Sequence, residues 1–254
     1  NIYEGAPFIK LDFTGVSNGF ALGSGAAYKT TDGGATWQSL AIENIGSALY
    51  FIDESTGFIS GIHSIYKTTD GGASWQTIDI EPRSFLDYHF ISATTGVATA
   101  KDFSDNQSLW RTTDGGATWK SVWDDYHFSL TTVFFLNEET GWAAGYYDQG
   151  GSTHEPVILK SNDGGTTWES IYHNYEVMGL GESFTDLRFK NAQEGFAVSE
   201  LFVNVVTLDG GVTWNRADED DAFSFPEFDC YYRSLAGYNN LFLTGTNGYL
   251  AIWK

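Results

Sequence analysis

The sequence predicts an all-β fold, a six-bladed β-propeller built from four-stranded antiparallel blades. Two repeated motifs and the composition predict it. The string Asp-Gly-Gly-x-Thr/Ser-Trp occurs five times in 254 residues, and a Phe and a Gly six residues apart precede each copy. Self-similarity at a period of a few tens of residues is typical of repeat architectures. Aromatic residues make up 17% of the chain, with 29 Gly and 4 Pro, which suits many short strands and tight turns.

The Phe and the Gly mark the first two strands of each unit. The Phe ends a segment of alternating apolar residues, such as Leu11 and Phe13, and this alternation is the two-residue period of a strand. The Gly begins an apolar segment of small residues that suits a crowded inner strand. A degenerate sixth copy occupies residues 232–245. The clear pairs are Phe13 and Gly19, Phe51 and Gly57, Phe90 and Gly96, Phe135 and Gly141, and Phe189 and Gly195.

The third strand leads into the Asp-Gly-Gly string, and the fourth begins near its Trp. We expect the Asp to accept hydrogen bonds from its own turn, and the glycines to supply the positive φ that a tight hairpin needs. The Trp is expected to pack between strands or neighbouring blades. A metal or phosphate loop is the alternative, but five copies around a ring would point outward in different directions. The residues given this structural role are Asp32, Trp37, Asp70, Trp75, Asp114, Trp119, Asp163, Trp168, Asp209 and Trp214.

The lengths of the connections predict where a ligand binds. The connection between strands one and two is constant in length, and so is the hairpin between strands three and four. The connections from strand two to strand three, and from blade to blade, vary. In a meander these two sets lie on opposite faces, and variable loops on a rigid scaffold commonly carry binding sites. We therefore expect the inserted-loop face to bind the ligand.

The last unit lacks sequence for a fourth strand. We expect residues 1–7 to supply it and to close the ring, which removes an open sheet edge. The chain is then a single propeller domain, residues 1–254. A seven-bladed ring is the alternative, and it would need more chain.

Charge and composition limit the partners. The chain has 13 basic and 33 acidic residues, a net charge of -20, which disfavours nucleic acid because phosphate binding needs clustered Lys and Arg. No apolar run is long enough to span a membrane. The histidines show no metal-ligand spacing, and residues 218–221 are expected to form a solvated acidic loop. We expect a monomer without metal or cofactor. The single cysteine, Cys230, cannot form an intrachain disulfide.

The fuller pattern, Thr-Gly-Phe-Ala-x-Gly followed by Lys-Thr-Thr-Asp-Gly-Gly-x-Thr-Trp, resembles the Asp-box or BNR repeat. That repeat occurs in sialidases, xyloglucan-active glycosidases, sortilin-type receptors and propeller-type photosystem II assembly factors. Residues 11–254 are most similar to the assembly-factor group and its secreted bacterial relatives. The resemblance implies a protein partner and an extracytoplasmic location, with a signal peptide removed before Asn1. One departure is that the chain has only five arginines, too few for the basic patch of the assembly factors.

A carbohydrate-active enzyme is the alternative to a non-enzymatic binding or scaffold protein. Sialidases grip a carboxylate with three arginines, and only Arg83, Arg188 and Arg233 could do so here, because Arg111 stands where other repeats have Lys. The early Arg-Ile-Pro segment of sialidases is absent, which makes this enzyme the least favoured. Other glycosidases need two carboxylates at a set separation, and 33 acids offer too many candidates.

The inserted loops contain aromatic, acidic and histidine side chains that suit a protein or glycan ligand. The alternative is that the aromatic side chains only pack beneath long loops. The candidate ligand-binding residues are Arg83, Asp102, Tyr126, His127, Tyr147, Asp148, His154, Glu155, His173, Tyr175, Glu176, Arg188 and Arg233.

Overall fold

The structure is a computed structural model that describes residues 8–23, 25–80, 83–102, 104, 106–148, 154–173, 183–199 and 204–217, and only the backbone of 232–236, 241–245 and 250–253. No described residue is helical, so the predicted all-β class is confirmed. Accordingly, none of the described chain forms a helix that could span a membrane. The chain divides into two compact units, residues 1–105 with 109–121, and residues 106–108 with 122–254.

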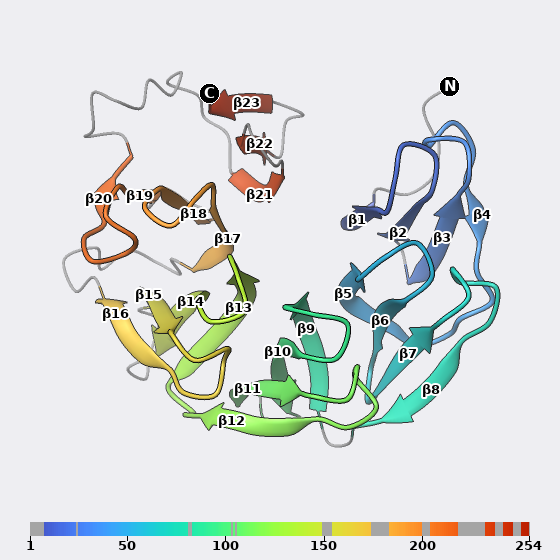
Figure 1. Ribbon diagram of the computed structural model, residues 1–254, viewed down its shortest axis with the longest axis horizontal. Coiled ribbons are helices and arrows are strands. Elements are labelled where there is room, and N and C mark those ends of the chain that lie inside the picture. Colours follow the sequence, from blue (N-terminus) through green and yellow to red (C-terminus); the bar gives the residue numbers. More distant parts are fainter. Residues whose placement is uncertain are drawn as a thin grey trace. The chain divides into compact units, whose positions relative to one another are not determined.

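The first unit contains two complete four-stranded sheets and most of a third, each an antiparallel meander in chain order (Figure 1). Sheet 1 comprises β1 (Lys10–Phe13), β2 (Gly19–Gly23), β3 (Ala26–Thr30) and β4 (Gln38–Ser39). Sheet 2 comprises β5 (Ile45–Phe51), β6 (Gly57–Gly61), β7 (Ser64–Thr68) and β8 (Gln76–Asp79). Sheet 3 comprises β9 (Arg83–Phe90), β10 (Gly96–Asp102), β11 (Gln107–Thr112) and β12 (Lys120–Asp124).

The second unit contains two further four-stranded sheets and a three-stranded one. Sheet 4 comprises β13 (Phe128–Phe135), β14 (Gly141–Asp148), β15 (His154–Ser161) and β16 (Glu169–His173). Sheet 5 comprises β17 (Phe184–Phe189), β18 (Gly195–Ser199), β19 (Val205–Thr207) and β20 (Asn215–Arg216). Sheet 6 comprises β21 (Tyr232–Ala236), β22 (Leu241–Gly245) and β23 (Leu250–Trp253). The predicted four-stranded repeat is thus present in five sheets, while the blade number and the closure of the ring by residues 1–7, which lie outside the described residues, stay predictions.

A Phe ring packed on a Gly explains the constant spacing of the repeat. In sheet 3, Phe90 lies directly across from Gly96 on the neighbouring strand. A Cβ atom added to Gly96 would lie 2.8 Å from Cδ1 of the Phe90 ring, which is too close for any side chain. The ring therefore covers the backbone of the second strand, and only Gly leaves it room. The same pairing occurs at Gly19, Gly57, Gly141 and Gly195.

Stacked side chains join neighbouring sheets within the first unit. Phe20 on β2 stacks on Phe51 of β5, with ring centroids 3.8 Å apart, and the edge of Trp75 meets Phe51 at 6.3 Å. Lys29 lies 5.7 Å from the Phe20 centroid, and its Nζ donates a hydrogen bond to the carbonyl of Gly71 in the next sheet at 2.6 Å. A cation over an aromatic ring adds about 0.5–1 kcal/mol at partly exposed sites. The next pair of sheets repeats this arrangement with Lys67, Phe58, Phe90, Trp119 and Gly115.

In the second unit a Trp takes the place of the stacked Phe in the same contact between sheets. Trp142 on β14 stacks on Phe189 of β17 at 3.5 Å between centroids, and Trp214 meets Phe189 edge-on at 5.8 Å. The Nζ atom of Lys160 lies 5.4 Å from the Trp142 centroid and donates to the carbonyl of Gly210 at 2.8 Å. The repeated Phe or Trp, the Lys and the hairpin glycines therefore belong to one contact between sheets.

The first strand of sheet 1 is less covered than its counterpart in sheet 2. Leu11 and Phe13 are 53% and 44% exposed, whereas Leu49 and Phe51 at the same positions are 2% and 7% exposed. Phe51 is covered by Phe20 of the preceding sheet, whereas no described sheet of the first unit precedes β1. Ring closure by a further sheet would cover this face.

Candidate functional site

Each Asp-Gly-Gly hairpin is held together by its own Asp. In the second hairpin, Asp70 Oδ1 accepts hydrogen bonds from Thr68 Oγ1 and from the backbone N–H of Ser74, and Oδ2 accepts one from Ser74 Oγ. Gly71 and Gly72 have φ of 66° and 80°, and the N–H of Gly72 donates to Thr68 Oγ1. Both carboxylate oxygens are therefore used inside the turn. The hairpins of Asp32, Asp114, Asp163 and Asp209 contain the same bonds.

These bonds stabilise the ionised form of the carboxyl group. The hydroxyl of Ser74 is the largest cause and its N–H the second, and together with the Thr68 hydroxyl they lower the pKa of Asp70 from 3.8 to about 2. In Asp163 and Asp209 partial burial opposes the effect, but the hydrogen bonds outweigh it and the pKa is again lowered. The pKa is also lowered to about 2 in Asp32 and Asp114.

The lowered pKa predicts an acid-dependent stability. A folded-state pKa of about 2 lies below the ordinary 3.8, so the stabilisation is present above about pH 4 and is lost as the pH falls toward 2. We therefore expect Asp70→Asn to lower the melting temperature at pH 6, and the difference from the unchanged chain to narrow between pH 4 and pH 2. Thermal unfolding followed by circular dichroism at several pH values measures this difference.

Ser74→Ala provides the matched variant, because it keeps the Asp70 carboxyl and removes its strongest donor. It should show part of the same pH-dependent loss. A difference between Asp70→Asn and the unchanged chain that is constant from pH 6 to pH 2 would contradict the assignment of the stabilisation to the ionised carboxyl.

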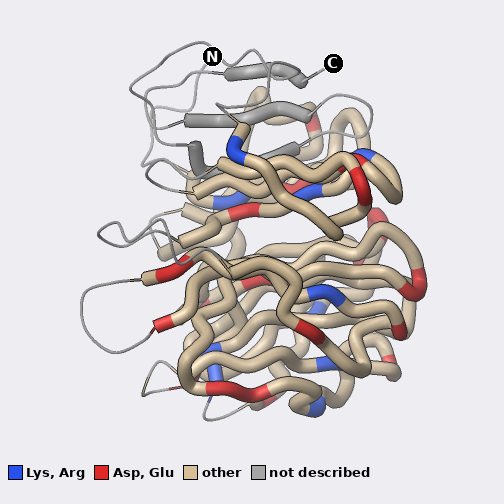
Figure 2. Tube along the Cα trace, turned by 90° about the vertical axis from the view of Figure 1, so that its left-hand side faces the viewer, with Lys and Arg blue, Asp and Glu red and all other residues tan. Residues whose placement is uncertain are grey.

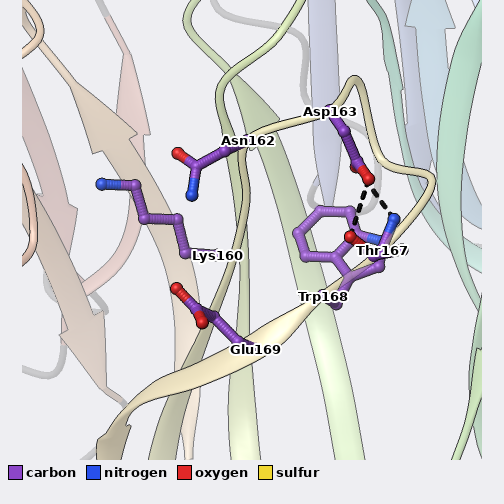
Figure 3. Close-up of a pocket in the computed structure, with 6 residues that line it drawn as sticks. All are labelled: Lys160, Asn162, Asp163, Thr167, Trp168 and Glu169. Atoms are coloured by element: carbon purple, nitrogen blue, oxygen red, sulfur yellow. Dashed lines mark hydrogen bonds between the residues drawn. The ribbon is translucent and has the colours of Figure 1, made fainter.

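A shallow hollow of about 330 Å³ lies beside the fourth hairpin (Figure 3). The Asp163 carboxylate in it bonds to Thr167, and Lys160 donates to Gly210 of the next sheet. Asp163 and Lys160 thus serve the hairpin and the contact between sheets 4 and 5, and we assign no ligand to the hollow. The hollow is lined by Lys160, Asn162, Asp163, Thr167, Trp168 and Glu169.

Five predicted residues meet at one end of sheet 4, and we call them the loop-end cluster: Tyr126, His127, Tyr147, Glu155 and His173. Tyr147 and Glu155 are directly paired on β14 and β15, so their side chains lie on the same face of the sheet. His173 Nε2 lies 2.6 Å from Glu155 Oε2. The rings of His127 and His173 lie 5.4 Å and 4.9 Å from Tyr147 between centroids, and Tyr126 lies 3.8 Å from His127.

The loop-end cluster runs from a buried carboxylate to an exposed ring. Glu155 is 2% exposed and Tyr126 is 71% exposed. Beneath the rings, Phe128 packs edge-on against Tyr147 at 5.1 Å and against Trp123 at 4.9 Å. Some aromatic rings of this loop therefore pack beneath it, while Tyr126 is displayed on the surface. Both alternatives of the sequence analysis, ligand binding and packing beneath the loops, describe part of this site.

Asp125 orients the imidazole of His127. Its Oδ1 atom accepts a hydrogen bond from the backbone N–H of His127 at 3.1 Å and lies 3.2 Å from the ring Nδ1. The side chains of Asp125 and His127 are 40% and 35% exposed. Asp125 was not among the predicted site residues; the signal that could have found it is its place two residues before His127, where an Asp commonly bonds the backbone two residues on.

Two predicted residues lie on the other face of sheet 4. His154 is paired with Asp148, and its ring stacks on Tyr146 at 4.0 Å between centroids. Because neighbouring residues of a strand point to opposite faces, Tyr146 and Asp148 are separated by the sheet from Tyr147. The predicted residues on sheet 4 therefore form two groups, one on each face of the sheet.

The described arginines of the predicted set are not part of the loop-end cluster. Arg83 belongs to the first unit, where its Nη1 lies 3.8 Å from Asp102 Oδ2 and its guanidinium lies 5.7 Å from the Trp110 centroid. Arg188 Nη1 lies 2.9 Å from Asp186 Oδ1, near the end of β17 that carries the Phe–Gly turn. A grip on a carboxylate ligand would compete with these ion pairs.

Several predicted residues lie outside what the structure describes. Tyr175 and Glu176 are outside the described residues, as are residues 218–221 and Cys230, and only the backbone of Arg233 is described. Among the described residues, no group of three His, Cys, Asp or Glu side chains is placed to hold a metal ion.

Comparisons with known proteins bear on the fold alone. No family model matches the sequence, and no curated protein matches it. YCF48 from Cyanidioschyzon merolae is similar in structure, with a TM-score of 0.67 and 17% identity over 98% of this chain and 82% of that chain. A structure of YCF48 bound to D1 peptide gives 0.52 and 17%, over 98% and 91%.

A GH74 xyloglucanase from Xanthomonas campestris is also similar, with a TM-score of 0.70 and 12% identity over 96% of this chain and 44% of that chain. The present chain thus spans less than half the length of that enzyme. Likeness at such low identity extends to the fold and not to the site. Along nearly its whole length, this chain is similar in fold to β-propeller proteins.

Proposed function

We propose that the chain is a non-enzymatic binding propeller that holds a protein or carbohydrate partner on the loop-end cluster of sheet 4. The observation that carries the proposal is the cluster itself. The exposed Tyr126 ring packs on His127, and the His127 ring packs in turn on Tyr147. His173 Nε2 lies against the carboxylate of Glu155, which is buried. Aromatic faces beside a few fixed polar groups are the usual lining of a binding site. Tyr147, Glu155 and His173 lie on strands of sheet 4, and Tyr126 and His127 lie in the turn before β13.

A carbohydrate-active enzyme is the second candidate, favoured by the likeness to the xyloglucanase.

The structure of YCF48 with D1 peptide is a case of a similar chain holding a peptide, and it supports a protein partner here. We further propose an extracytoplasmic location and a monomeric state. Both rest on the sequence, the first on the resemblance to secreted propellers and the second on the expected closed ring.

One sample can test the proposed function. The protein is applied to a glycan array and a peptide array, and it is incubated in parallel with xyloglucan and a sialyllactose to detect hydrolysis. We expect binding without turnover, and Tyr126→Ala should weaken that binding about tenfold, equivalent to about 1.4 kcal/mol. Val212→Ala, a change at a site that is 75% exposed in the fifth hairpin, is the control and should leave the affinity unchanged. Turnover that disappears when one carboxyl is replaced would refute the non-enzymatic function.

A further inference from the structure

The chain segment that contains most of the loop-end cluster has no Lys or Arg. Residues 121–159, which include β13, β14 and most of β15, have no Lys or Arg. Figure 2 shows the same imbalance more widely, with more acidic than basic positions along the described trace. The acids of this stretch are Asp124, Asp125, Glu138, Glu139, Asp148 and Glu155.

Two of these acids directly precede the exposed ring of the cluster. Asp124 is exposed and the side chain of Asp125 is 40% exposed, and Tyr126 follows them with 71% of its surface exposed. Aromatic faces attract cations within about 6 Å of the ring centroid, by about 0.5–1 kcal/mol at exposed sites. A guanidinium or ammonium group at this ring could also form charge-assisted hydrogen bonds with the carboxylates that precede it in the chain. The combination fits a cation better than a neutral or anionic group.

Three cationic side chains of the second unit are already engaged. Lys160 donates to Gly210, Arg188 pairs with Asp186, and Lys190 lies 3.2 Å from Glu194. An anionic ligand at the cluster would therefore meet carboxylates and no cation from residues 121–159. Charge complementarity thus favours a positively charged partner.

We propose that the loop-end cluster binds an arginine- or lysine-bearing segment of a partner protein, whose cationic group lies against Tyr126 beside Asp124 and Asp125. This inference rests on the proposed function and specifies its partner. Such a partner carries positive charge, whereas a basic patch would bind a partner with negative charge.

The test uses a short fluorescent peptide with two arginines and blocked ends, and a second peptide in which neutral citrulline replaces both arginines. Fluorescence anisotropy at 150 mM salt, where charges separated by more than about 8 Å are screened, gives the two dissociation constants. We expect the arginine peptide to bind at least about tenfold more tightly than the citrulline peptide, since each 1.4 kcal/mol changes affinity about tenfold. Tyr126→Ala should weaken the arginine peptide about three- to tenfold, because it removes both the cation–aromatic contact and the contact area of the ring.

Two double variants separate a local site from general attraction to an acidic protein. Asp124→Asn with Asp125→Asn removes two charges beside Tyr126, and Glu138→Gln with Glu139→Gln removes two exposed charges from the turn at the other end of β13 and β14. The first should weaken the arginine peptide about tenfold, and the second less than twofold. Equal effects of the two double variants, or equal binding of the two peptides, would overturn the proposal.

Failure of this inference can be told from failure of the proposed function. Loss of glycan binding in Tyr126→Ala, without binding of the arginine peptide, would keep the cluster as a site and refute the cationic partner. No effect of Tyr126→Ala on any ligand that binds would refute both.

Discussion

Replacement of Trp142 by alanine is expected to lower the free energy of unfolding by about 3–5 kcal/mol, the usual cost of removing a large buried aromatic side chain. Trp142 is 1% exposed and stacks on Phe189 at 3.5 Å between centroids. Lys160 covers it, with Nζ 5.4 Å from its centroid. The substitution would thus open a cavity at the contact between sheets 4 and 5 and remove the aromatic partner of the lysine.

The repeat itself provides the control for this prediction. Phe20, Phe58 and Phe196 stand at the equivalent position of other sheets, so Trp142→Phe keeps a ring where the architecture accepts one. The indole Nε1 of Trp142 is buried without a hydrogen-bond partner among the described residues, and its removal offsets part of the lost packing. We expect Trp142→Phe to cost less than half as much as Trp142→Ala in urea unfolding followed by circular dichroism. Equal losses in the two variants would show that the stacked ring is not what holds the sheets.

The strands were predictable because their signals are local. A Phe that covers a Gly six residues later requires a turn of constant length between two paired strands, and the sequence repeats this spacing at Phe13, Phe51 and Phe90. The sequence did not predict that Phe20 stacks on Phe51 or that Lys29 reaches Gly71. Those contacts join residues of different repeats, and their partners follow only from how the sheets pack.

The loop-end cluster was predictable in membership but not in arrangement. Loop length and composition indicated His127, Tyr147 and His173, which the structure brings together. Tyr147 and His154 lie on opposite faces because of the register in which β14 and β15 are paired beyond the repeat. That register cannot be inferred from the composition of the loop. The ion pair of Arg188 with Asp186, two residues earlier on the same strand, was not predicted.

Replacement of Gly96 by alanine is the second large expected effect, a loss of about 1–3 kcal/mol from overpacking. The added Cβ would lie 2.8 Å from Cδ1 of Phe90. Phe90 is 6% exposed, and Phe58 stacks on it at 4.5 Å while Trp119 meets it at 5.9 Å. The ring therefore cannot yield without disturbing its neighbours. Urea unfolding measures the loss.

Gly15→Ala is the matched control, since its Cβ would meet only the flexible end of Glu54, 3.3 Å away. It should change the free energy of unfolding by less than about 0.5 kcal/mol. A loss as large as that of Gly96→Ala would contradict the steric explanation and point to a general intolerance of alanine in these turns.

Gly19→Ala extends the same measurement to the closure of the ring. Its Cβ would lie 2.7 Å from the Phe13 ring, nearly the distance found at Gly96, but Phe13 is 44% exposed where Phe90 is 6% exposed. A ring closed over β1 would hold Phe13 as firmly as Phe90 is held, so closure predicts equal losses in Gly19→Ala and Gly96→Ala. A clearly smaller loss in Gly19→Ala would mean that Phe13 swings outward to admit the new methyl group, and that no sheet covers the first strand.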